Sequence, residues 1–167
     1  FYTLTQHRIF LTLVFSSIVL FLLGFIDDIR SLSPFTRLLI QVAISIFIAE
    51  SGVSIKEINL AWLNVNTIYL SHYISTILTT FWIVGLVNAI NWLDGLDGLA
   101  SGITGFAALG LTIISYQNGQ LYVPIIAASI SGCSFGFLRF NFYPARMLMG
   151  DSGSYFLGFA LAITSIL

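Results

Sequence analysis

The chain alternates long apolar runs with short polar stretches. Apolar residues dominate six segments, at about 9–26, 34–50, 74–90, 102–116, 121–138 and 154–167. A helix rises about 1.5 Å per residue, so most of these runs come close to spanning a bilayer core of ~30 Å. The pattern predicts an all-α integral membrane protein, a polytopic bundle of about six transmembrane helices in a single domain over residues 1–167.

The one long polar interlude, residues 51–73, has a different periodicity. Polar and apolar residues partly alternate over 53–60 and again over 64–70. Alternation with a period of two is typical of strands that are half buried. We therefore expect a small β-hairpin at the membrane surface, between the second and third spans.

Three shorter polar stretches, at 27–33, 88–101 and 139–154, separate the other spans. Counting crossings puts all three on one side of the membrane and the hairpin on the other. Four of the six basic residues lie with the three stretches, at Arg30, Arg37, Arg139 and Arg146. Basic residues mark the cytoplasmic side, so we expect these stretches to face the cytoplasm and interpret Arg30 and Arg37 as membrane anchors.

Composition supports this interpretation and excludes other classes of protein. The 167 residues are 57% hydrophobic and only 8% charged, and the mean hydropathy is +0.97. The net charge of −1 and the six basic residues argue against a nucleic-acid-binding surface. The sequence begins with Phe and stops within an apolar run, so we expect it to be part of a longer protein.

The stretch 88–102 is the centre of the candidate chemistry. Asn88, Asn91 and Asp94 recur at steps of three, which in a helix places them roughly on one face. Gly95 and Gly98 favour a broken backbone after them. Polar groups this dense beside a bilayer indicate a site, although a loop whose Asn and Asp residues cap the flanking helices is the alternative.

The residue types on this side favour a hard cation and phosphate chemistry. Five of the seven acidic residues gather there, with no nearby His or Cys, and oxygen-only ligands suit Mg²⁺, with Mn²⁺ as a substitute. Neighbouring arginines suit phosphate groups. The pattern predicts Mg²⁺-assisted phosphoryl transfer. An ion-coupled transporter is the alternative from another class, but it predicts carboxylates inside the spans rather than at their ends.

The three polar stretches together resemble the polyprenyl-phosphate N-acetylhexosamine-1-phosphate transferases (glycosyltransferase family 4). That family includes undecaprenyl-phosphate GlcNAc-1-phosphate transferases and phospho-MurNAc-pentapeptide translocases. The motifs that carry the resemblance are Asp27-Asp28 with Leu32, Pro34 and Gln41; Asn88 through Ala100; and Asn141 through Ala145 leading to Met149 through Ser154. Their order and spacing cover most of the chain, so the combination is more specific than any one motif.

The resemblance assigns roles to the acidic and amide residues. It implies that Asn91 and Asp151 bind Mg²⁺. It implies that Asp27 and Asp28 are a catalytic acidic pair beside the polyprenyl phosphate, with Asp27 as the base that deprotonates it. Asp94 matches a catalytic position near the diphosphate of the nucleotide.

The resemblance also implies a set of substrate-binding residues: Asn88, Asp97, Asn141 and Arg146. Within this set, Asp97 and Asn141 match positions near the uracil. Leu148 departs from the family pattern, because some members carry an aromatic residue there that stacks on the base.

The implied reaction is Mg²⁺-dependent transfer of an N-acetylhexosamine-1-phosphate from a UDP-amino sugar to undecaprenyl phosphate, with release of UMP. The short link from Asp28 to Pro34 and the continuation Ser152 through Phe159 favour UDP-GlcNAc, and a MurNAc-pentapeptide donor is the alternative. The implied setting is the inner membrane, with the active site on the cytoplasmic face, a role in starting cell-envelope polysaccharides such as lipopolysaccharide O-antigen, and assembly as a homodimer.

Overall fold

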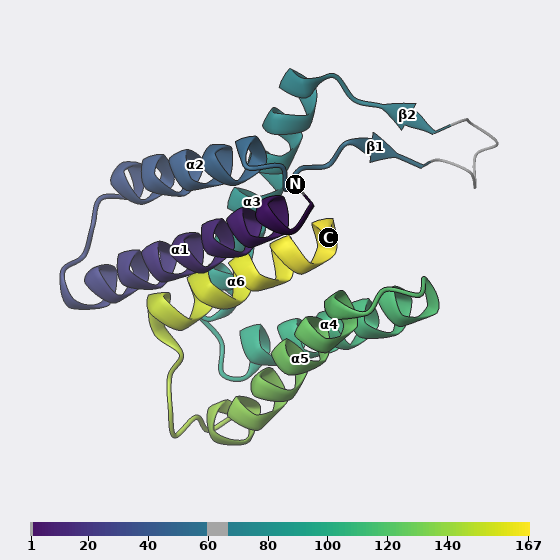
Figure 1. Cartoon of the computed structure of the whole chain (residues 1–167). Coiled ribbons are helices and arrows are strands. Elements are labelled where there is room, and N and C mark those ends of the chain that lie inside the picture. Colours follow the sequence, from purple (N-terminus) through teal and green to yellow (C-terminus); the bar gives the residue numbers. More distant parts are fainter. Residues whose placement is uncertain (1, 60–66) are drawn as a thin grey trace.

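The computed structural model describes residues 2–59 and 67–167, with side chains from residue 7 onward. The described residues form six helices and a pair of two-residue strands (Figure 1). The helices are α1 (Tyr2–Ile29), α2 (Pro34–Glu50), α3 (His72–Leu93), α4 (Leu99–Gln117), α5 (Tyr122–Asn141) and α6 (Gly150–Ile166). Each expected apolar run is therefore helical, which confirms an all-α polytopic membrane protein.

Helix length distinguishes these elements. Among the described residues, α1 (from His7), α3, α4 and α5 are long and apolar enough to cross a membrane, with mean hydropathy from 1.5 to 2.7. Helices α2 and α6 have 17 residues each, so each rises roughly 25 Å, slightly less than a ~30 Å core. Both lengths lie at the lower end of the range, about 17–25 residues, that crosses a membrane.

The start of α2 follows from its local sequence. Pro34 occupies the first turn, where its missing N–H removes no helical hydrogen bond. The Ser33 side chain accepts a hydrogen bond from the backbone N–H of Thr36 at 3.1 Å and caps the helix. Both features are local consequences of the sequence Ser33-Pro34.

Helix α6 is central to the bundle. It packs against α1 on one side and α3 on the other, whereas α4 and α5 pack mainly against each other (Figure 1). Gly158 permits the contact with α3, because a Cβ added there would lie 2.8 Å from the backbone of Leu86 and Val87. The buried residues at the centre of these contacts are Leu20, Leu23, Ile48, Ile83, Val87, Tyr155 and Phe159.

The expected hairpin is present but short. Strands β1 (Glu57–Ile58) and β2 (Ile68–Tyr69) pair antiparallel, and residues 60–66, which include parts of both expected strand segments, lie outside the described residues. Its base is fixed to α3, because Thr79 Oγ1 accepts a hydrogen bond from Ile55 N–H at 2.9 Å. The hairpin extends from the end of the bundle opposite the loops 30–33 and 142–149 (Figure 1).

Candidate functional site

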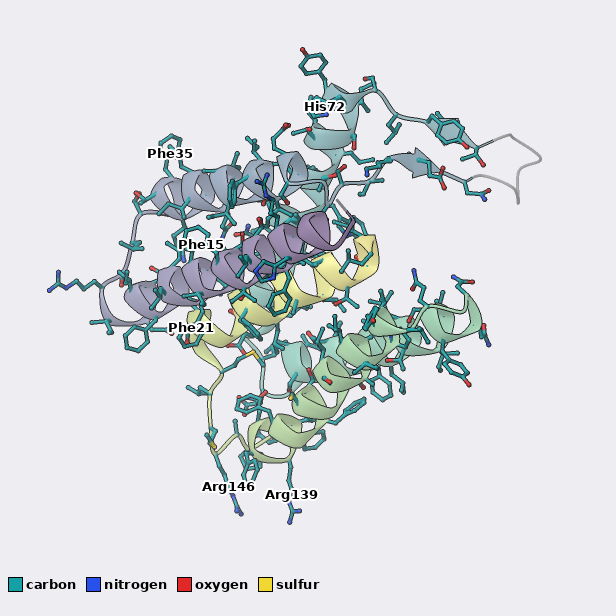
Figure 2. The ribbon with its side chains drawn as sticks, in the orientation of Figure 1. Phe15, Phe21, Phe35, His72, Arg139 and Arg146 are labelled. Carbon is teal, nitrogen blue, oxygen red and sulfur yellow. The ribbon has the colours of Figure 1, made fainter. Side chains whose placement is uncertain are left out.

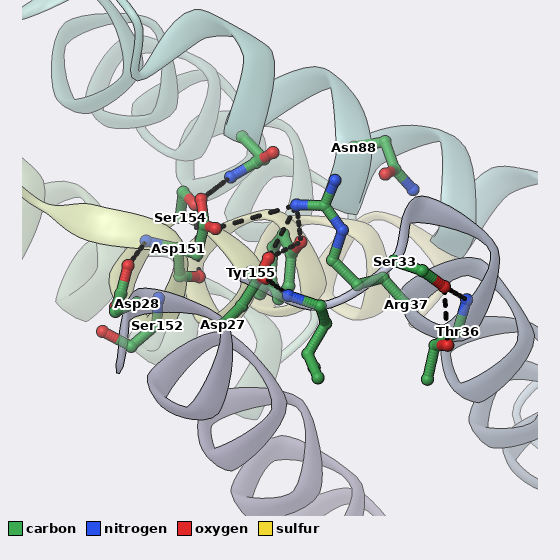
Figure 3. Close-up of polar contacts among 12 residues, drawn as sticks. Asp27, Asp28, Ser33, Thr36, Arg37, Asn88, Asp151, Ser152, Ser154 and Tyr155 are labelled. Atoms are coloured by element: carbon green, nitrogen blue, oxygen red, sulfur yellow. Dashed lines mark hydrogen bonds and ion pairs between the residues drawn. The ribbon is translucent and has the colours of Figure 1, made fainter. Parts of the chain in front are cut away.

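The three polar stretches meet at one end of the bundle, as expected. Asp28, at the end of α1, accepts hydrogen bonds from the backbone N–H groups of Asp151 and Ser152, at 2.8 and 3.1 Å (Figure 3). The second and third stretches are joined where Asp97 accepts a hydrogen bond from Ala145 N–H at 2.9 Å. Residues far apart in sequence therefore form a single polar site.

Asn91 and Asp151, the expected metal ligands, are direct neighbours. Asn91 is in the last turn of α3 and donates its Nδ2 to Asp151 Oδ1 at 2.5 Å and to Ser154 Oγ at 3.0 Å. The Asp151 side chain is about one-third exposed, so it can reach a ligand. Within the described residues, no group of three or more His, Cys, Asp or Glu side chains forms a complete protein cage for a metal. Two oxygen-bearing side chains fit an ion such as Mg²⁺, which keeps waters and binds substrate phosphates.

Asp94 follows directly on α3 and adds negative charge beside this pair. The pKa of Asp94 is raised from 3.8 to about 6, mainly by burial and to a smaller extent by the charges of Asp151 and Asp28, while a hydrogen bond from the backbone of Gly150 opposes the shift. The carboxylates of Asp94, Asp151 and Asp28 therefore repel one another. This electrostatic imbalance fits a site that binds a positive ion.

Asp27 contacts the α1–α2 link, α2 and the side chains of α6, whereas Asp28 accepts hydrogen bonds from the backbone of α6. It is 7% exposed, and its Oδ1 accepts a hydrogen bond from Leu32 N–H at 2.7 Å. Its Oδ2 forms an ion pair with Arg37 Nη1 at 2.6 Å, and the hydroxyl of Tyr155 lies 3.4 Å from both groups (Figure 3). The expectation that Arg37 is a plain membrane anchor is wrong, since it lies inside the acidic cluster, 3.8 Å from Asp151 Oδ2.

A large groove opens beside Arg37, between α2 and α3. Its volume is about 800 Å³, and it runs from Thr76 near the hairpin side to Trp92 near the site. Its lining is mainly apolar: Pro34, Leu38, Val42, Ile46, Ile77, Phe81, Val84, Gly85 and Ala89, with Arg37, Thr76, Thr80, Asn88 and Trp92 as the other lining residues. The apolar groove therefore extends along α2 and α3 and opens at Arg37, beside the polar site.

Asn88 lines this groove, and within the described residues its side chain makes no hydrogen bond to Asp151 or Asn91. Its Nδ2 donates to Gln41 Oε1 at 2.6 Å and to Val84 O at 2.8 Å. Gln41 is 1% exposed and Asn88 is half-buried, so the pair is a partly buried amide link between α2 and α3. The sequence placed Asn88 and Asn91 on roughly one face, but their side chains reach different neighbours.

Asn141 and Arg146 differ in their surroundings. Asn141 is 2% exposed; its Oδ1 accepts from Gly98 N–H and Ser101 Oγ, both at 3.1 Å, and its Nδ2 donates to Met147 O at 3.0 Å. A direct contact between Asn141 and a base would need some of these bonds to break. Arg146 is exposed and projects away from the bundle beside Arg139 (Figure 2).

All seven acidic residues lie at helix ends or in connecting segments. None lies in the middle of a span, where an ion-coupled transporter would need a carboxylate. The arrangement therefore favours chemistry at one membrane face over transport.

Comparison with known proteins agrees with this geometry. Residues 10–167 match the sequence profile of Glycosyl transferase family 4. The chain belongs to this family. Within glycosyl transferase family 4, it is 32% identical over 149 residues to the probable undecaprenyl-phosphate N-acetylglucosaminyl 1-phosphate transferase of Bacillus subtilis (strain 168), covering 89% of this chain and 41% of that protein.

Other members of glycosyl transferase family 4 are similar to the same extent. The phospho-N-acetylmuramoyl-pentapeptide-transferase of Clostridioides difficile (strain 630) is 36% identical over 162 residues, covering 87% of this chain and 48% of that protein. The protein of the same name from Prochlorococcus marinus (strain MIT 9515) is 38% identical over 168 residues, covering 93% and 46%. The chain thus spans about half the length of these relatives.

Proposed function

We propose that the whole protein transfers an N-acetylhexosamine-1-phosphate from a UDP-amino sugar to a polyprenyl phosphate, releasing UMP. The observation that carries this proposal is that a candidate metal site and an apolar groove meet at Arg37. The Asn91–Asp151 pair, which suits a divalent cation, lies beside Arg37 at the mouth of an apolar groove of membrane depth. A water-soluble phosphate donor and a lipid phosphate acceptor both need such a junction.

Asn91 and Asp151 are the residues that would hold Mg²⁺, or Mn²⁺ in its place. When bound, the ion neutralises the negative charge that develops on the diphosphate as its P–O bond breaks. The raised pKa of Asp94, about 6, supports a cation nearby, since burial and two neighbouring carboxylates disfavour its charge. Asp94 lies at the end of α3, three residues after Asn91, and faces the same site.

The groove between α2 and α3 suits the isoprenoid tail of the acceptor. A chain of isoprene units is apolar and long, and the groove has an apolar lining from Ile77 to Ala89. Arg37 is exposed enough, at 28% of its side chain, to bind the acceptor phosphate at the groove mouth. In the structure Arg37 is paired with Asp27. When Arg37 turns to the acceptor phosphate, its ion pair with Asp27 is broken. Asp27 Oδ2 is then free to accept the proton of that phosphate, which fits a role as the general base.

The donor would lie over the loops that Asp97 and Asn141 hold together. Asp97 is exposed and fixed by Ala145 N–H, which makes it available to a nucleotide. A UDP-GlcNAc-type donor is favoured by the short Asp28–Pro34 link and by the sequence after Asp151. A MurNAc-pentapeptide donor has support of its own, because several similar relatives carry that name. The proposed setting is the cytoplasmic face of the inner membrane, in synthesis of a cell-envelope polysaccharide, and the homodimer expected from the resemblance stays a prediction.

A direct assay of UMP release tests the proposal. Full-length protein in detergent is supplied with undecaprenyl phosphate, Mg²⁺ and either UDP-GlcNAc or UDP-MurNAc-pentapeptide. We expect turnover with one donor, loss of turnover in EDTA, and restoration by Mg²⁺ or Mn²⁺. Asp151→Ala should lower turnover at least ~100-fold, because it removes a charged ligand of the ion. Full activity of this variant, or turnover unaffected by EDTA, would contradict the assignment.

A further inference from the structure

The two adjacent carboxylates at the end of α1 have different partners. Asp27 points into the bundle toward Arg37, whereas the hydrogen bonds of Asp28 within the described part of the chain all go to the first turn of α6. We propose that Asp28 is a positioning residue, which holds α6 so that Asp151 faces Asn91, and that it takes no part in proton transfer. The consequence for metal binding rests on the proposed function of Asp151.

Helix α6 needs an N-terminal cap from elsewhere in the chain. The first N–H groups of any helix lack acceptors within that helix, and a carboxylate there also interacts favourably with the helix dipole. Met149, at the N-cap position of α6, makes no side-chain hydrogen bond to it. Asp28 supplies two of the acceptors, with Oδ1 to Asp151 N–H and Oδ2 to Ser152 N–H, across 123 and 124 residues of sequence. Asp94 accepts a third hydrogen bond, from the backbone of Gly150.

Glycines make room for this contact on both helices. Gly24 lies one turn before Asp28 on α1, and a Cβ added there would lie 2.5 Å from the backbone of Asp151 and Ser152. Gly150 has φ of +71°, a conformation that side chains other than glycine rarely adopt, and a Cβ there would lie 3.0 Å from the Asp28 carboxylate. The backbones of α1 and α6 are therefore in direct contact at Asp151 and Ser152.

This geometry fixes the Asp151 side chain through its own backbone. Asp151 donates its backbone N–H to Asp28, and its side-chain Oδ1 accepts a hydrogen bond from Asn91 at 2.5 Å. Both Asp28 oxygens accept backbone N–H groups of α6, so the carboxylate bridges the end of α1 and the first turn of α6. Asp28 therefore acts on the site through Asp151.

Two substitutions separate positioning from chemistry. Asp28→Asn keeps one carbonyl acceptor of the same length, whereas Asp28→Ala keeps none. Neither amide nor methyl group can transfer a proton as a carboxylate does, so a chemical role predicts equal loss in both variants. A positioning role predicts that Asn stays close to wild type and Ala does not. Glu57→Gln, a charge-neutralising change on the hairpin, is the matched control.

The measurements use full-length protein in detergent. Hydrogen exchange of the peptide covering 150–157, without divalent ions, reports the cap itself. We expect roughly tenfold faster exchange at Asp151 and Ser152 in Asp28→Ala and a smaller change in Asp28→Asn. The affinity for Mn²⁺, followed by electron paramagnetic resonance, should fall roughly 10-fold or more in Asp28→Ala and less in Asp28→Asn. Glu57→Gln should match wild type in both.

Turnover at saturating Mg²⁺ completes the test. Asp28→Asn should keep kcat within about threefold of wild type and show its defect in the Mg²⁺ concentration required. The proposal is overturned if exchange at 150–157 is unchanged in Asp28→Ala, or if Asn loses kcat as fully as Ala. If wild type shows no turnover with either donor, the proposed function fails, but exchange and Mn²⁺ affinity still decide the role of Asp28.

Discussion

The adjacent residues Asp27 and Asp28 have different contacts and different roles in this protein. Asp27 is buried in an ion pair with Arg37, and Asp28, beside it in sequence, is exposed and binds backbone N–H groups of α6. A carboxylate in an ion pair can be freed when a competing anion takes its partner. A carboxylate that caps a helix cannot be freed without loosening that helix. Substitutions at the two positions should therefore have different effects.

The kinetic effect of Asp27 should differ from that of Asp97. Asp27→Asn should depress kcat and leave UDP-sugar binding nearly intact, because proton transfer is felt mainly in the transition state. Asp97→Asn should weaken UDP-sugar binding, since a ground-state contact with the nucleotide is lost. Calorimetric UDP-sugar affinity, measured beside steady-state turnover, distinguishes them. The reverse pattern would exchange the two roles.

Asp94 should make the stability of the metal-free protein depend on pH. Its pKa is raised from 3.8 to about 6 in the folded protein, so folding favours the protonated form. This contribution is fully present below pH 3.8 and is lost as the pH rises through about 6. Asp94→Asn stays neutral, so its melting temperature should exceed that of wild type increasingly from pH 4 to about 6.5 and by a constant amount above that.

Thermal melts in detergent with EDTA measure this difference directly. Addition of Mg²⁺ should raise the melting temperature of wild type and reduce the advantage of the variant at pH 7.5, because a cation favours the charged carboxylate. A variant with the same pH profile as wild type would show that another group controls the stability.

The residue types of the site could be predicted from sequence, but their partners could not. Convergence of the three polar stretches followed from counting spans, and the Asp28–Asp151 and Asp97–Ala145 contacts confirm it. The sequence did not reveal the Asp27–Arg37 ion pair or the Asn88–Gln41 link. Side-chain partners depend on helix rotation and on close packing, and a pattern of residue types along one chain constrains neither closely.

At the scale of elements, the helix boundaries show the same limit. The expected span 34–50 coincides with α2, whose proline and serine cap are local signals. Helix α6 begins at Gly150, four residues before the expected start at 154. Its first turn contains no local cap, so its sequence resembles a loop. The acceptors come from Asp28 and Asp94, which are distant in sequence, so the local sequence does not indicate them.

The groove between α2 and α3 gives a prediction at this scale. A Cβ at Gly85 would meet nothing within 4 Å, so Gly85→Leu should fold normally while its side chain fills part of the groove. We expect the KM for polyprenyl phosphate to rise about tenfold or more, with UDP-sugar affinity unchanged, because the volume needed by the lipid tail is reduced. The measurement is steady-state kinetics with each substrate varied in turn.

Gly132 on α5 offers the matched control. It is also exposed, and a Cβ there also meets nothing within 4 Å, but it does not line the groove. Gly132→Leu should have wild-type KM values. Equal effects of the two substitutions would indicate a general consequence of replacing a helical glycine, and would remove the groove from the acceptor site.

At the scale of the whole molecule, the polar site and the hairpin lie at opposite ends of the bundle (Figure 1). Cysteines introduced at exposed positions of a variant lacking Cys133 should report this arrangement. Ser31→Cys and Leu96→Cys should react with an impermeant maleimide from the same side of the membrane, and Tyr69→Cys from the other. Comparing the labelling of each cysteine in intact cells with its labelling in inside-out vesicles shows which side of the membrane it faces. If Leu96→Cys and Tyr69→Cys react from one side, the count of spans is wrong.

The long-range cap on α6 also has a consequence for biogenesis. Asp28 and Asp151 are 123 positions apart, so at a synthesis rate of ~5–20 residues per second the ribosome needs roughly 6 to 25 s to pass from one to the other. Throughout that interval the nascent chain can insert its first five helices, yet the Asp28 carboxylate has no helix end to bind. Translation that stops before residue 150 would leave a membrane-inserted polypeptide whose acidic end is unassembled and open to quality-control proteases.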